Sequence, residues 1–161
     1  MNGKAKRVQL QLNAIKCQLL KTKQDIIMTN PEFELAPELK RDCIDLADWP
    51  LCKVLLLNDS QYPWFVLVPR QPALKEIIDL SEGDQVVYLK ESAKLSKLIM
   101  GVFKPDKLNI AALGNMVPQL HIHHIARFTT DAAWPAPIWG KYPAVPYTEL
   151  QITELKKALQ F

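Results

Sequence analysis

The feature that most constrains the fold is a pair of apolar segments, residues 51–57 and 64–68, joined by a short polar connection. The second segment is β-branched and aromatic, a composition that favours strands, and it stops at Pro69. The connection contains Asn58, Asp59 and Ser60, a cluster typical of turns. We therefore predict that the two segments form an antiparallel β-hairpin.

Further elements are indicated on both sides of this hairpin. A long helix is expected to begin near Ser81, because Ser81 and Asp84 have the form of a capping box and apolar residues then recur at helical spacing until Pro105. The remaining segments predict a short first helix, a short apolar segment, two strands, an irregular proline-rich stretch and a final helix: 37–41, 43–46, 107–112, 120–128, 134–147 and 148–159. About five strands with one main helix predict an α+β domain with a mostly antiparallel sheet.

The positive charge of the chain is confined to its N-terminal part. Residues 1–27 carry six basic side chains and one acidic one, whereas residues 28–161 carry 14 basic and 16 acidic ones. We predict a basic amphipathic N-terminal arm, 1–27, followed by a single domain, 28–161. An alternative is that translation starts at Met28, after which the composition changes. The domain itself does not have the basic surface of a nucleic-acid-binding protein.

The cysteines and the apolar runs bear on location. Three cysteines, Cys17, Cys43 and Cys52, have no C-x-x-C spacing, and their odd number does not suit a disulfide framework. No apolar run approaches the roughly 20 residues that a membrane span needs, and the N-terminus lacks the pattern of a signal peptide. These features predict a cytoplasmic protein without a membrane partner.

The candidate chemistry lies in one segment that holds all three histidines of the chain, His121, His123 and His124. On a strand, alternate side chains share a face, so His121 and His123 lie with Gln119 and Arg127, and His124 points to the apolar side. A neutral histidine can attack phosphorus while a second one holds the phosphoryl oxygens. Two other possibilities are a metal site, for which no third ligand is evident, and buried histidines with a structural role.

The segment 119–127 resembles the signature His-φ-His-φ-His-φ-φ of the histidine triad (HIT) superfamily. Arg127 follows His123 by four residues, as an arginine commonly does in the family, and Gly114-Asn115 stands where the family has Gly-Gln before the triad. Both anchors place Gln119, His121 and His123 at the first, second and third triad positions. With the hairpin and the Trp/Pro-rich tail at 133–140, the resemblance to a bacterial HIT subgroup covers roughly residues 40–140.

The resemblance implies the HIT-like α+β fold, a five-stranded mostly antiparallel sheet with one long helix and a short C-terminal helix, usually as a homodimer. It implies that His121 is the nucleophile, with its other ring nitrogen donating to a backbone carbonyl, and that His123 holds oxygens on which charge develops. Gln119 is expected to take over the orienting role of the first histidine. The mechanism needs no metal and no cofactor. His124 is expected to be a packing residue, and Arg127 is either part of this pattern or an exposed strand charge.

The resemblance also implies a nucleotide site and an activity. Gly114 and Asn115 are expected at the phosphate, with Asn109 as a further candidate, and Asn58 at the ribose, with Asp59 as its alternative. The implied activity is that of a nucleotide phosphohydrolase or nucleotidyl transferase acting on a purine nucleotide derivative, a dinucleoside polyphosphate or a nucleoside phosphoramidate. The alternative is a non-catalytic nucleotide-binding or regulatory module, because a glutamine cannot take up a proton.

Overall fold

The computed structural model describes residues 33–161, so the arm expected at 1–27 lies outside the described residues. The elements are α2 (Pro37–Asp42), β1 (Cys43–Asp48), β2 (Cys52–Leu57), β3 (Trp64–Pro69), a 3-10 turn η1 (Ile77–Asp79), α3 (Glu82–Phe103), β4 (Lys107–Ala111), β5 (Ile122–Arg127) and α4 (Glu149–Leu159). The five strands form one antiparallel sheet in the order β1-β2-β3-β5-β4. The predicted α+β fold with one long helix and a short C-terminal helix is confirmed.

The hairpin and the long helix form where the sequence predicts them. In the hairpin, β2 and β3 pair from Cys52 opposite Pro69 to Leu56 opposite Phe65. The Ser81 side chain accepts a hydrogen bond from the backbone N–H of Asp84 at the start of α3, which satisfies an otherwise free donor. Neither α3, with 22 residues, nor any other helix within residues 33–161 is long and apolar enough to cross a membrane.

The strand expected over residues 120–128 is shorter than predicted. It begins at Ile122, because the backbone N–H of Leu120 donates to the carbonyl of Leu74 and not to a neighbouring strand. His121 therefore stands just before β5, and His123 stands inside it.

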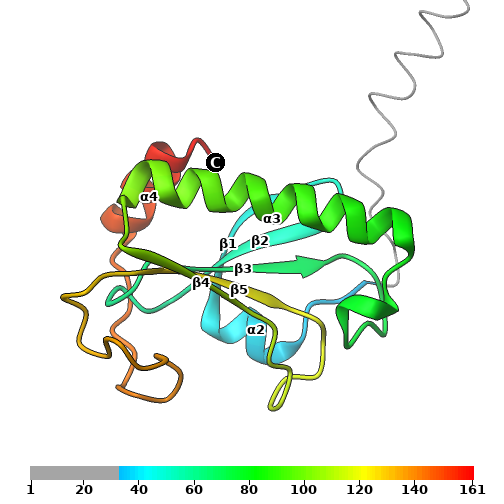
Figure 1. Cartoon of the computed structure of the whole chain (residues 1–161), viewed down its shortest axis with the longest axis horizontal. Coiled ribbons are helices and arrows are strands. Elements are labelled where there is room, and N and C mark those ends of the chain that lie inside the picture. Colours follow the sequence, from blue (N-terminus) through cyan, green and yellow to red (C-terminus); the bar gives the residue numbers. More distant parts are fainter. Residues whose placement is uncertain (1–32) are drawn as a thin grey trace, which may run out of the picture.

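The sheet separates two layers that differ in kind (Figure 1). On one face lie α3 and α4, packed on the helix-face cluster, whose fully buried members include Val54, Phe65, Leu95, Ile99 and Ile122. On the other face lie α2 and the irregular segment 131–147, packed on the pocket-face cluster, which is built from Leu39, Leu55, Tyr62, Trp64, Val66, Val68, Ile125, Ala133 and Ile138. Side chains alternate along β5, so that Ile122, His124 and Ala126 point to the helices, and His123, Ile125 and Arg127 point to the other layer.

Candidate active site

A cavity of about 370 Å³ opens on the pocket face of the sheet, next to the start of β5. Its walls come from α2, from the loop between β4 and β5, and from Trp139 in the irregular segment. The lining residues are Glu38, Leu39, Asp42, Leu57, Trp64, Leu113, Gly114, Asn115, Met116, Val117, His121, His123 and Trp139. Four of the residues predicted for the site, His121, His123, Gly114 and Asn115, thus meet at one cavity.

His121 is held by the backbone of its own segment. Its Nδ1 atom lies 2.6 Å from the carbonyl oxygen of Gln119. A carbonyl can only accept a hydrogen bond, so Nδ1 carries the proton and Nε2 keeps its lone pair. This is the arrangement expected for a nucleophilic histidine. His121 is 7% exposed, and within residues 33–161 its Nε2 atom has no hydrogen-bond partner.

His123 has the opposite tautomer. Its Nδ1 atom accepts a hydrogen bond of 2.9 Å from the indole Nε1–H of Trp64, so its own proton sits on Nε2. Burial, with the neighbouring His121 and His124 acting in the same direction, lowers the pKa of His123 from 6.5 to about 3. The imidazole is therefore neutral at physiological pH. The rings of His121 and His123 are nearly perpendicular, with centroids 4.9 Å apart.

The turn that carries Gly114 and Asn115 forms one wall of the cavity. Gly114 has a φ of +68°, in the left-handed region where a side chain adds strain and glycine does not. The glycine thus allows the chain to turn sharply between β4 and β5. The turn brings Asn115 to the same cavity as the two histidines.

Gln119 contributes to the site through two different groups. Its backbone carbonyl receives the His121 proton described above. Its side-chain oxygen accepts from the backbone N–H of Ala36 at 2.9 Å, and its amide nitrogen donates to the carbonyl of Glu34, also at 2.9 Å. Within residues 33–161 the side chain bonds to neither of the other two triad positions. The amide instead fixes the segment that leads into α2, a wall of the cavity.

Asn58 and Asp59 lie outside the lining of this cavity. The side-chain oxygen of Asn58 accepts from the backbone N–H of Tyr147 at 2.9 Å. Asp59 is 5% exposed, and its carboxylate accepts from the backbone N–H groups of Gln61 and Val145. Asn58 lines a neighbouring pocket together with Asp42, which also lines the main cavity. The ribose contact of Asn58 or Asp59 stays a prediction. Asp42 is a further polar side chain, and it lines both pockets.

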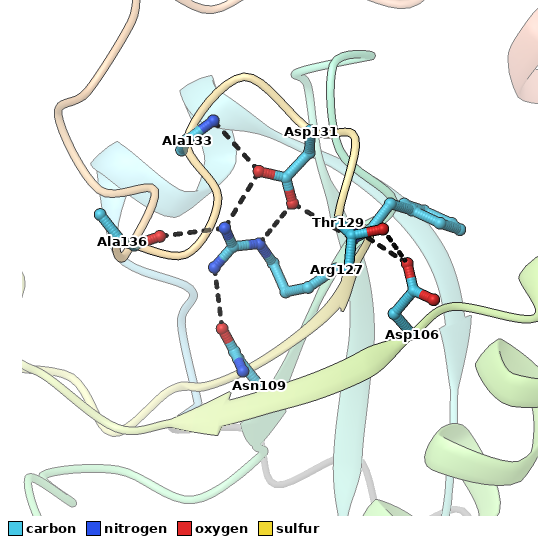
Figure 2. A network of polar contacts seen from close by, with 8 residues as sticks. Asp106, Asn109, Arg127, Thr129, Asp131, Ala133 and Ala136 are labelled. Atoms are coloured by element: carbon cyan, nitrogen blue, oxygen red, sulfur yellow. Dashed lines mark hydrogen bonds and ion pairs between the residues drawn. The ribbon is translucent and has the colours of Figure 1, made fainter.

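Arg127 is buried at the centre of a polar network (Figure 2). It is 2% exposed, so it is not the exposed strand charge that was one alternative. Its guanidinium donates to Asp131 at 2.8 and 3.0 Å, to the carbonyl of Ala136 at 2.9 Å and to the side chain of Asn109 at 2.9 Å. Asn109 thus faces Arg127 and does not line the cavity. The network fixes the start of the segment that presents Trp139.

His124 serves the opposite face of the sheet, as predicted. Its Nε2 atom lies 2.8 Å from the hydroxyl of Ser92 on α3, and its Nδ1 lies 3.2 Å from the carbonyl of Ile122. Burial lowers the pKa of His124 to about 4. The residue joins the histidine strand to the long helix and has no access to the cavity.

The sequence did not identify several residues that shape the site. Trp64 was assigned to the hairpin, and no spacing connects it to His123, because their proximity depends on the pairing of β3 with β5. Trp139 packs on the pocket-face cluster and lies 5.4 Å from His123 by ring centroids. Glu38 and Asp42 also line the cavity, and the sequence pattern assigns no role to either. Within residues 33–161 no group of three His, Cys, Asp or Glu side chains is placed to hold a metal ion.

Comparisons with known proteins bear on the family and the fold. The family model described as the HIT domain matches residues 40–130. A crystal structure of a histidine triad protein from Marinobacter aquaeolei VT8 is 51% identical, with a TM-score of 0.78 over 80% of this chain and 93% of that one. A histidine triad protein from Bradyrhizobium japonicum is 48% identical, with a TM-score of 0.78 over 80% of this chain and 96% of that one. No curated protein is significantly similar in sequence.

A third structure, a histidine triad protein from Sinorhizobium meliloti 1021, is 35% identical, with a TM-score of 0.79 over 81% of this chain and 96% of that one. The chain belongs to the histidine triad (HIT) family. The resemblance found in the sequence is thus confirmed at the level of the family and its fold.

Proposed function

We propose that the protein is a nucleotide phosphohydrolase or nucleotidyl transferase that acts on a purine nucleotide derivative through a nucleotidyl-histidine intermediate. The substrate is a dinucleoside polyphosphate or a nucleoside phosphoramidate. The observation that carries the proposal is the pair of opposite tautomers at one cavity. His121 offers a lone pair on Nε2 and His123 offers an N–H on Nε2, which are the two groups that displacement at phosphorus requires.

The reaction has two displacements. In the first, the Nε2 lone pair of His121 forms a bond to the α-phosphorus, and the bond to the leaving group breaks, with the electron pair going to the leaving group. The resulting imidazolium keeps its Nδ1 proton, and the carbonyl of Gln119 stabilises its positive charge. In the second, water attacks the phosphorus and loses a proton to solvent, and the P–N bond breaks, returning its electron pair to Nε2. Another acceptor in place of water gives nucleotidyl transfer.

The neighbouring residues have supporting roles in this proposal. The neutral His123 donates its Nε2–H to an oxygen of the phosphoryl group, where negative charge develops. Asn115, on the turn opened by Gly114, binds another phosphate oxygen. The aliphatic and aromatic lining, including Leu39, Leu57 and Trp139, receives the purine, and Asn58, with Asp59 as the alternative, binds the ribose.

The experiment is turnover of an adenosine phosphoramidate and of a diadenosine polyphosphate, with and without EDTA, by the wild-type protein and by His121→Ala and His121→Asn. We expect AMP release that survives EDTA and falls at least about a thousandfold in both variants, because they lack the nucleophile. An intermediate trapped by acid quench should carry the nucleotide on His121. Turnover that persists in both variants would exclude His121 as the nucleophile.

A non-catalytic nucleotide-binding module is the second candidate, and Gln119 is the observation that favours it. A glutamine side chain does not titrate, so no proton can be taken up at the first triad position. Its amide is also engaged with residues 34 and 36. In this case AMP raises the melting temperature, no substrate is turned over, and Gln119→His is the next variant to assay.

We also propose that the protein forms a homodimer in the cytoplasm. β4 is an edge strand of the sheet, and its Ile110 is 48% exposed, a combination that invites pairing with a second copy. Light scattering should give twice the mass of the chain, and Ile110→Lys should give a monomer. The two cysteines among residues 33–161, Cys43 and Cys52, are free thiols, which suits a reducing compartment.

A further inference from the structure

We propose that Trp64 is a positioning residue that holds His123 as a neutral donor through its Nε2–H. In this role His123 stabilises an oxygen of the reacting group and does not act as a cationic acid. The inference rests on the function proposed for this site. It concerns a residue of the hairpin that bears no titratable group.

The direction of the hydrogen bond is unambiguous. The indole Nε1–H of Trp64 lies 2.9 Å from Nδ1 of His123, and an indole N–H can donate but cannot accept. Nδ1 must therefore present its lone pair. The ring proton is left on Nε2, and both residues line the cavity.

The sheet and the aromatic packing fix both rings in this arrangement. In the antiparallel pairing of β3 with β5, Trp64 stands opposite Ile125 and His123 stands opposite Val66, so the two side chains are diagonal neighbours on one face. Their ring centroids lie 5.5 Å apart in an edge-to-face arrangement. Trp139 packs on His123 from a second direction, 5.4 Å away. A turn of the imidazole by half a revolution would place a carbon against the indole N–H and lose the bond.

The same bond opposes protonation of His123. An imidazolium would direct an Nδ1–H at the indole N–H, which would break the hydrogen bond and leave two donors facing each other in a buried site. The charged form is also disfavoured by burial, since His123 is 6% exposed, and by the neighbouring imidazole of His121 on the same face. The lowered pKa of His123 agrees with this geometry.

Nitrogen NMR of the histidine rings tests the proposal without any substrate. In ¹⁵N-histidine-labelled wild-type protein at neutral pH, we expect Nδ1 of His123 to be unprotonated and Nε2 protonated, the reverse of His121. The His123 signals are assigned from the spectrum of His123→Asn. Finding the proton of His123 on Nδ1 would overturn the proposal whatever the tryptophan variants show.

The matched variants are Trp64→Phe and Trp139→Phe. Both remove an indole N–H from a ring that packs on His123, but the N–H of Trp139 has no partner within residues 33–161. We expect Trp64→Phe to give a mixture of the two tautomers of His123, and Trp139→Phe to keep the wild-type tautomer. Equal effects of the two variants would show that packing alone sets the tautomer, which would contradict the proposal.

Kinetics on the preferred nucleotide substrate complete the test. Trp64→Phe should lower kcat about tenfold, the size expected for one buried hydrogen bond, with KM changed less than about twofold. A rise in KM with unchanged kcat would overturn the positioning role. If wild-type protein turns over no nucleotide, the proposed function fails while the tautomer measurement still decides the role of Trp64.

Discussion

The two faces of the sheet are built in different ways. The helix face is a regular layer in which α3 and α4 bury apolar side chains, and the polar contact between Ser92 and His124 joins α3 to β5. The pocket face is covered by the short α2 and by the irregular segment 131–147. There polar side chains bond to backbone groups of the covering segments, Gln119 before α2 and Arg127 at Ala136.

The two faces therefore have different roles: one mainly stabilises the fold, and the other forms the candidate site. On the helix face, burial of apolar surface supplies most of the stabilisation. On the pocket face, polar side chains hold segments that line the cavity, and within residues 33–161 the Nε2 atoms of His121 and His123 have no hydrogen-bond partner. The four predictions below test this separation, from the largest effect to the smallest.

Arg127→Ala should lower the free energy of unfolding by about 3–5 kcal/mol, because it leaves the buried Asp131 without its partner. Activity should fall as well, since the segment that presents Trp139 loses its anchor. Urea denaturation and steady-state kinetics measure the two effects. Lys40→Ala removes an exposed ion pair with Glu34 and should change stability by less than about 1 kcal/mol. A similar loss of unfolding free energy in both variants would show that the buried network around Arg127 stabilises the fold no more than an exposed ion pair does.

Leu95→Ala should destabilise the protein by about 2–5 kcal/mol without a change in kcat or KM beyond about twofold. Leu95 is fully buried in the helix-face cluster, and its truncation leaves a cavity. The kinetics are measured well below the melting temperature of the variant. A large loss of kcat in protein that remains folded would show that the two faces are coupled.

Stability should fall as the pH is lowered from 7 to 5. The pKa values of His123 and His124 are about 3 and about 4 in the folded protein, against 6.5 ordinarily. Below pH 6.5 the unfolded chain therefore binds protons that the folded chain does not. Each histidine should remove on the order of 1 kcal/mol per pH unit in this window. Urea denaturation at several pH values measures this dependence. The free energy of unfolding of His124→Gln should fall less steeply between pH 7 and pH 5 than that of the wild type. An unchanged pH dependence would refute the assignment.

Gln119→Ala should raise KM by about three- to tenfold and leave kcat nearly unchanged. The substitution removes the amide that holds the segment before α2, a loss of about 1 kcal/mol. It keeps the backbone carbonyl that orients His121. Steady-state kinetics separate the two parameters. A collapse of kcat at constant KM would mean that the amide itself takes part in the reaction.

The sequence was informative where a pattern depends on neighbours along the chain. Alternation placed His124 on the helix face and His123 on the other, and the capping pair at Ser81 located the start of α3. The bond between Trp64 and His123 could not be predicted in this way, because it requires the register of two strands that are distant in sequence. The partners of Gln119 and Asn58 were equally out of reach, since both are backbone groups of irregular segments. A side-chain pattern does not reveal such groups.

The contact between His121 and the carbonyl of Gln119 has a consequence for how this site can vary. Every amino acid supplies a carbonyl, so the orientation of His121 by this contact is independent of which side chain stands at position 119. That side chain is free to be selected for another task, and here it secures the entry to α2. One residue can therefore orient a histidine through its main chain while its side chain shapes a different wall of the cavity.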